Sequence, residues 1–317
     1  MTGKRNLAAA ALLAGVLAAT PLARAQNENQ GQGTAVITVL PKSDKAAAPN
    51  ITTQDVHVKV DGKDATISTW NSLHGEQAPV ELVLLIDGGA RTSLGREWGD
   101  IQGFIKSLPP NVKIGLAYMQ NGGARFSGPL TSDHARALQE LHLPTGVPGT
   151  SASPYFCLST LAKEWPSQDP QARREVIMIT DGVDYYHLQY DPDDPYVQAA
   201  INDSVRAHLV VYSIYWRSAG RVNRTWYENN AGQNLLLQVA QATGGNSYWQ
   251  GLGNPESFSP YFDDFVRRLR NQYELGLSAP LHGKAHVESL KVKLNASDVK
   301  VTSPERVYLV PAGAGQQ

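Results

Sequence analysis

The pattern of apolar positions changes twice along the chain. Segments rich in strand-forming residues lie toward both ends, several of them alternating between apolar and polar positions: residues 34–40, 56–60, 65–70, 287–294 and 299–310. Alternation predicts strands with one buried face, and the Asp61-Gly62 pair predicts a hairpin. Because the ends of a compact chain commonly lie close together, we expect the strands of residues 280–317 to pair with those of residues 34–78 in a small antiparallel β unit.

Between these flanks, nearly unbroken apolar runs alternate with helical segments. The runs are residues 80–86, 112–119, 175–180 and 209–216, and the helical segments are residues 93–108, 133–142, 154–165, 195–208, 234–243 and 254–271. Unbroken runs are typical of parallel strands buried on both faces. The sequence therefore predicts an α/β domain over residues 79–279, with a doubly wound, mostly parallel sheet and helices on both faces.

The first 25 residues have the layout of a secretory signal. A basic start precedes an apolar run at residues 7–19, and small residues before Gln26 form a cleavage site after Ala25. The run is shorter than the roughly 20 residues that span a bilayer, and no later segment is apolar enough to do so. We expect export to the periplasm or the exterior, a flexible leader at residues 26–33, and no transmembrane segment after cleavage.

Charge and cysteine content narrow the possible functions. Removing residues 1–25 takes away three basic residues and no acid, so the net charge changes from −1 to about −4. A weakly acidic chain lacks the basic field that nucleic-acid binding needs, so we expect no nucleic-acid partner. Cys157 is the single cysteine and cannot form an internal disulfide. Its apolar helical context predicts a buried, inert thiol.

Two acidic residues directly follow two of the apolar runs. Asp87 ends the first run, and Asp181 lies in the Thr-Asp-Gly turn after the third. Ligands of open α/β sheets bind at the carboxyl ends of the strands. Across residues 80–278, this pattern resembles a von Willebrand factor A-type (VWA) domain. The resemblance implies an Mg²⁺ site built from an Asp-x-Ser-x-Ser loop, a later threonine and the aspartate of the Thr-Asp-Gly turn, with one position open to a partner's carboxylate.

The residues that match the surviving ligand positions are Asp87, Asp181 and either Thr150 or Ser153. Gly89 and Arg91 occupy the two serine positions, and neither supplies a hydroxyl. The resemblance therefore implies a degenerate metal site. We expect no cofactor, although Mg²⁺ is the ion that the remaining oxygens would suit.

Arg91 suggests what could replace the ion. It follows Asp87 by four residues, and a guanidinium there could bridge Asp87 and Asp181 and relieve the repulsion between them. The alternative is that Arg91 points to solvent and a water fills the gap. The flanks at residues 51–63 and 273–308 also resemble an exported VWA-related family that is abundant in acidobacteria.

Loops at the strand ends are candidate partner contacts. The residues concerned are Gly88, Gly89, Asp184, Tyr185, Tyr186, Arg217 and Trp226. These loops could instead be merely solvated, and the acidic loop at residues 184–194 could hold a second cation. No nucleophile elbow, zinc-protease motif, P-loop or dinucleotide fingerprint is present, so we expect no enzyme. The sequence favours an exported, non-enzymatic VWA-type module for protein–protein or adhesion contacts. The alternatives are a structural component of an envelope complex acting through the β flanks, and an uncharacterised hydrolase.

Overall fold

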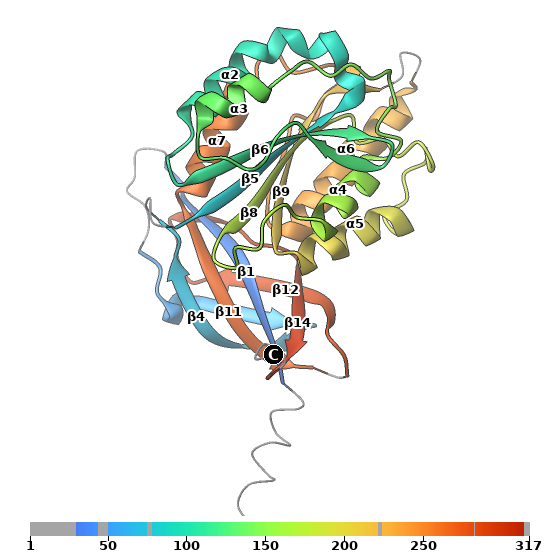
Figure 1. Ribbon diagram of the computed structural model, residues 1–317. Coiled ribbons are helices and arrows are strands. Elements are labelled where there is room, and N and C mark those ends of the chain that lie inside the picture. The colour runs from blue at the N-terminus through green and yellow to red at the C-terminus, as the bar shows by residue number, and fades with distance from the viewer. Residues whose placement is uncertain (1–29, 44–49, 75–77, 221–223, 282, 314–317) are drawn as a thin grey trace, which may run out of the picture.

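The protein combines an α/β unit with a second, antiparallel sheet (Figure 1). The computed structural model describes residues 30–43, 50–74, 78–220, 224–281 and 283–313. The predicted signal at residues 1–25 lies outside the described residues. Within the described part of the chain, no helix is both long and apolar enough to cross a membrane.

The sheet of the α/β unit has six strands in the order β10-β9-β8-β5-β6-β7. The strands are β5 (Val80–Asp87), β6 (Val112–Gln120), β7 (Gly123–Phe126), β8 (Arg173–Thr180), β9 (Leu209–Tyr215) and β10 (Ser247–Tyr248). All pairings are parallel except that of β6 with the edge strand β7. Every residue of β5 is buried, as its unbroken apolar run predicts. The predicted α/β fold class, with a mostly parallel sheet, is confirmed.

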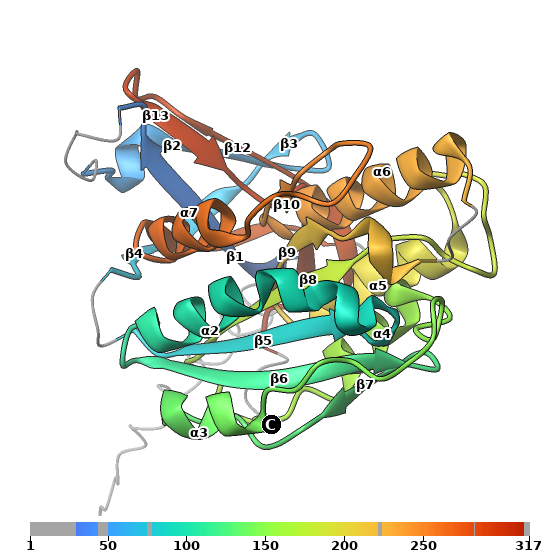
Figure 2. The same ribbon diagram turned by 90° about the horizontal axis from the view of Figure 1, so that it is seen from above.

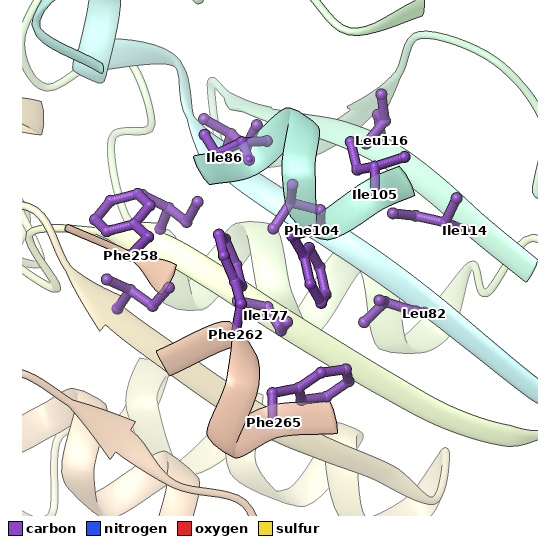
Figure 3. Packing of buried hydrophobic residues seen from close by; sticks show 14 of the residues in the cluster. Leu82, Ile86, Phe104, Ile105, Ile114, Leu116, Ile177, Phe258, Phe262 and Phe265 are labelled. Atoms are coloured by element: carbon purple, nitrogen blue, oxygen red, sulfur yellow. The ribbon is translucent and has the colours of Figure 1, made fainter. Parts of the chain in front are cut away.

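Helices cover both faces of this sheet. On one face are α2 (Trp98–Ser107), α3 (His134–Glu140) and α7 (Ser259–Leu269), and on the other are α4 (Pro154–Lys163), α5 (Pro195–Arg206) and α6 (Trp226–Thr243). Figure 3 shows the first face, where Phe104 of α2 stacks on Phe262 of α7 with ring centroids 4.1 Å apart. On the opposite face, Cys157 is buried in α4, and burial raises the pKa of its thiol to about 12.

Two helices begin at residues other than those that the sequence predicts. The helix α6 begins at Trp226, before the expected residue 234, because Thr225 and Glu228 form a capping box. The segment after β5 is a 3-10 element, η2 (Gly88–Glu97), interrupted at Arg91, where φ is 48°. The helix α2 therefore starts only at Trp98.

The second sheet joins both flanks of the chain. Its strands are β1 (Gln30–Pro41), β2 (Val56–Val60), β3 (Lys63–Asp64), β4 (Thr66–Ser72), β11 (Gln272–Pro280), β12 (His286–Leu294), β13 (Val299–Thr302) and β14 (Arg306–Pro311). Their order is β3-β2-β12-β14-β1-β11-β4, with β13 also paired to β1. The C-terminal strands β12, β13 and β14 thus pair with β1 and β2 in antiparallel register. The helices α5 and α7 contact this sheet (Figure 2).

Two boundaries differ from the sequence prediction. The strand β11 belongs to the second sheet and not to the α/β unit, because it pairs with β1 and β4 over most of its length. The strand β1 begins at Gln30, so residues 30–33 are part of a sheet and not of a flexible leader. Residues 26–29 of that leader lie outside the described residues.

Candidate functional site

Asp87 and Asp181 lie side by side at the carboxyl ends of neighbouring strands. β5 and β8 pair in parallel with Ile86 opposite Ile179, so the residues that follow them meet at the same edge. Asp87 Oδ1 accepts a hydrogen bond from the Gly89 N–H (2.8 Å), and its Oδ2 accepts one from Thr180 Oγ1 (2.7 Å). Both carboxylates are buried, at 1% and 0% exposure. The two acids that the sequence singles out therefore share one solvent-shielded site.

The cation at this site is Arg224, not Arg91. Arg224 Nη1 lies 2.7 Å from Asp181 Oδ2, and the arginine side chain is 4% exposed. Its Nη2 donates to the carbonyl of Arg217 (2.9 Å). Arg91 is exposed and has no ion pair with either aspartate among the described residues. The proposed Arg91 bridge is therefore wrong: the positive φ of Arg91 interrupts η2, and its side chain lies at the surface.

Sequence reasoning did not single out Arg224. The available signal was the capping box that begins one residue later, at Thr225. That motif fixes the start of α6 and places Arg224 at the end of the β9–α6 loop, beside the carboxyl ends of the strands.

Glycines allow residues 217–220 of this loop to lie close to Asp181 and Gly89. A Cβ at Gly220 would lie 2.2 Å from Asp181 Oδ2 and 2.4 Å from the guanidinium carbon of Arg224. A Cβ at Gly89 would lie 2.3 Å from the carbonyl oxygen of Ala219, in the 3-10 turn η3 (Arg217–Ala219). Real Cβ atoms do not approach that closely, so the space that a serine side chain would need at position 89 is filled by the β9–α6 loop.

A different hydroxyl from the two expected ones lies next to Asp87. The Thr150 hydroxyl is engaged with the backbone of Val147, and Ser153 caps α4. Ser151 Oγ is buried and has no hydrogen-bond partner among the described residues, yet it lies close enough to Asp87 to lower the pKa of that carboxyl. Residues 149–153 contain three hydroxyl side chains. Spacing in the sequence alone could not identify Ser151 as the one that lies next to Asp87.

The two carboxyls both have raised pKa values but differ in their partners. Burial raises the pKa of Asp87 to about 7, and the neighbouring Asp181 raises it as well, against hydrogen bonds from Thr180 and Gly89. Burial also raises the pKa of Asp181, but the Arg224 guanidinium opposes that shift. Asp181 is therefore the carboxylate that the site pairs with a cation, while neutral hydrogen-bond donors hold Asp87.

These residues do not fit a divalent ion. The donors are two carboxyls and the unpaired Ser151 hydroxyl, while positions 89 and 91 supply no oxygen ligand from a side chain. Arg224 already neutralises Asp181 at ion-pair distance, and the β9–α6 loop lies over the space beside Gly89. Hard divalent ions need several oxygen ligands and open coordination space. The site is built around an internal guanidinium.

The raised pKa of Asp87 predicts a pH dependence of stability. A carboxyl whose pKa is raised on folding binds more protons in the folded state, so its contribution falls as pH rises between about 4 and about 7. We expect Asp87→Asn to lessen this loss of stability with rising pH, as measured by urea unfolding across that range. Other groups contribute equally in the wild type and in Asp87→Asn. The raised pKa of Glu175 also makes stability fall with rising pH, while the lowered pKa values of His74 and His208 make it rise. The difference between variant and wild type is therefore the readout.

The matched control is Asp64→Asn, a substitution at an exposed strand position. It should leave the pH profile unchanged. If Asp87→Asn gave the same profile as the control, Asp87 would not be the titrating group.

The predicted contact residues are only partly accessible. Gly88, Gly89 and Asp184 are buried and cannot contact a partner, which corrects their prediction as contact residues. Tyr185 donates a hydrogen bond to Asp181 Oδ2 (3.2 Å) and is partly buried. The exposed members of the predicted set are Tyr186, Arg217 and Trp226.

The large apolar side chains that are exposed on the described chain lie in segments toward the carboxyl ends of the α/β strands. They are Val147, Tyr186, Leu188, Tyr190, Trp226, Tyr227, Trp249 and Leu252. Seven of them lie in a loop or first helical turn that follows a strand of the α/β sheet, and Val147 lies in the loop between α3 and α4. The loop bearing Val147 reaches the end of β5, because a Cβ at Gly146 would lie 2.8 Å from the carbonyl oxygen of Gly88. We call the surface formed by these eight residues the loop face.

Comparisons with known proteins give matches among solved structures. No family model matches the chain, and no curated protein matches it. The chain is similar to the conserved hypothetical protein BatB from Bacteroides thetaiotaomicron, at 15% identity over 60% of this chain and 98% of that chain, with a TM-score of 0.43. It is similar to the pilus adhesin SpaC from Lactobacillus rhamnosus GG, at 8% identity over 85% and 49%, TM-score 0.45. A third similarity is to manganese-loaded Plasmodium vivax TRAP protein, at 15% identity over 76% and 98%, TM-score 0.37. At these identities the similarities concern the fold.

Proposed function

We propose that this chain is an exported, non-enzymatic VWA-type module that binds a protein partner through its loop face, without a metal ion at Asp87 and Asp181. The observation that carries the proposal is the gathering of the exposed large apolar side chains on that one face. The secretory layout of residues 1–25 supports export.

The composition of the loop face is that of a contact surface. Single exposed apolar residues are ordinary, but a contiguous group of them is a feature of interaction sites. Tyrosine and tryptophan are enriched at protein interfaces, where they combine a large apolar area with a polar tip. Trp226 is 66% exposed and Tyr186 is 61% exposed, so both present most of their surface to a partner. Arg217 provides a charged group beside them.

The Asp87–Asp181 site beneath the loop face is closed, which favours direct side-chain contacts with the partner over a metal ion shared with it. Arg224 and the β9–α6 loop occupy the region above Asp181. A carboxylate from a partner therefore has no ion to bind there. In this proposal the aromatic side chains of the loop face provide the affinity, and the Asp181–Arg224 pair fixes the loops that carry them.

Site-specific photo-crosslinking in intact producing cells tests the proposal. A photoreactive phenylalanine analogue placed at Trp226 or Tyr186 should give one defined adduct in the exported fraction. The matched control position is Lys59, which is exposed on β2 of the second sheet. An adduct from Lys59 but not from Trp226 or Tyr186 would contradict the proposal and favour an assembly role through the β flanks.

A further inference from the structure

The loop between β8 and α5 gathers a second group of polar side chains, separate from the Asp87 site. One ligand atom each of Asp184, His187 and Asp194 lies within 4.8 Å of the other two. Asp184 and Asp194 are buried, while His187 is exposed. The three residues therefore form a group of two buried carboxylates and one exposed imidazole.

Backbone hydrogen bonds hold one oxygen of each carboxylate and leave the other oxygen free of backbone contacts. Asp194 caps α5, and its Oδ1 accepts the N–H groups of Tyr196 (2.8 Å) and Val197 (3.1 Å). Its Oδ2 lies 2.6 Å from His187 Nδ1. Asp184 Oδ1 accepts the N–H of Tyr186 (2.8 Å). Anchoring of this kind orients ligands before an ion arrives and strengthens metal sites.

One oxygen in this group accepts no hydrogen bond of ordinary geometry, although the Ser153 hydroxyl lies near this carboxyl. Asp184 is 1% exposed, and its Oδ2 is buried without a hydrogen bond to any described residue. No lysine or arginine within the described ranges forms an ion pair with Asp184 or Asp194. Leaving a carboxylate oxygen buried and unpaired is costly, and such groups in folded proteins are normally paired or coordinate a metal. The unpaired oxygen is the independent sign that a cation belongs here.

We propose that Asp184, His187 and Asp194 form a binding site for a divalent transition-metal ion, with Zn²⁺ the best match. Zn²⁺ binds histidine nitrogen and carboxylate oxygen at about 2.0–2.2 Å and commonly takes three protein ligands and a water. The two positive charges neutralise the two carboxylates. Bonds from His187 Nδ1 and Asp194 Oδ2 to the ion would replace the hydrogen bond between these two atoms, with the imidazole bound in its neutral form.

The ring of His187 is already oriented for this role. It stacks on Tyr196 with the ring centroids 5.2 Å apart and the planes at 14°. The same loop carries Tyr186 and Tyr190 of the loop face. A bound ion would therefore fix the geometry of this part of the face. The metal site itself does not depend on the proposed function, since its residues and its unpaired oxygen stand apart from the contact surface.

Titration of the protein with Zn²⁺ after treatment with a chelator tests the site. We expect calorimetry to show one high-affinity ion per chain, and Zn²⁺ to raise the thermal unfolding temperature. His187→Ala removes an exposed ligand and should weaken binding at least about tenfold, within the range seen when ligand shells are altered. Asp184→Asn should do the same. Asp193→Asn is the matched control, because Asp193 is an exposed acid of the same loop outside the group.

Two outcomes would overturn the proposal. One is the absence of a high-affinity Zn²⁺ site in the wild type. The other is binding of equal affinity and stoichiometry in wild type and His187→Ala, which would place the ion elsewhere. If Asp184→Asn fails to fold, the His187→Ala comparison still decides, because His187 is exposed and its loss leaves the core intact.

Discussion

Replacing Arg224 by methionine is expected to lower the free energy of unfolding by about 3–5 kcal/mol, the usual cost of removing one partner of a buried ion pair. Asp181 would keep its hydrogen bonds from Val183 and Tyr185 but lose the only positive charge that contacts it among the described residues. Arg224 is 4% exposed, so solvent cannot take over that role. Urea unfolding at neutral pH measures the change.

Two further variants make this result specific. Arg91→Ala, at an exposed position, should change stability by no more than about 0.5 kcal/mol. The double variant Arg224→Met with Asp181→Asn removes both charges and should recover part of the loss. An Arg224→Met protein as stable as the Arg91→Ala protein would show that the Asp181–Arg224 pair does not hold the site together.

Restoring a serine at position 89 is expected to destabilise the protein and not to create a metal site. In Gly89→Ser, the new Cβ would meet the carbonyl oxygen of Ala219 at 2.3 Å, which the backbone of η3 can relieve only by moving. Overpacking of this kind typically costs about 1–3 kcal/mol. Because Arg224 remains in contact with Asp181, we expect no measurable Mg²⁺ binding by calorimetry.

The matched control is Gly103→Ala in the interior of α2. A Cβ there meets nothing within 4 Å, so the substitution should stabilise the helix by about 0.5–1 kcal/mol. Gain of tight Mg²⁺ binding by Gly89→Ser, or a stability equal to that of wild type, would mean that the β9–α6 loop leaves room for a metal ligand.

The parts of the fold that the sequence predicts are those encoded by local periodicity. The run at β5 is buried on both faces, so its apolar residues are continuous and the strand is recognisable without its neighbours. Asp87 and Asp181 could be placed together because parallel strands bring their carboxyl ends to one edge. The pairing of β11 with β1, by contrast, is set by tertiary contacts between residues far apart in the sequence.

The missing parts of the site depend on how loops fold back. Arg224 reaches Asp181 only because Gly220 lets the β9–α6 loop pass close to the carboxylate. Arg91 is nearer than Arg224 to Asp87 in the sequence, so sequence proximity favoured Arg91 as the cation of the site. Its backbone conformation, which interrupts η2, could not be foreseen from residue type, since a positive φ is unusual for arginine.

The most direct test of a site closed by arginine is a crystal structure of the wild-type protein grown with Mn²⁺, with anomalous scattering recorded. We predict the Arg224 guanidinium in contact with Asp181 and no anomalous peak between Asp87 and Asp181. A peak there, with Asp87, Ser151 and Asp181 as ligands and Arg224 displaced, would contradict the account.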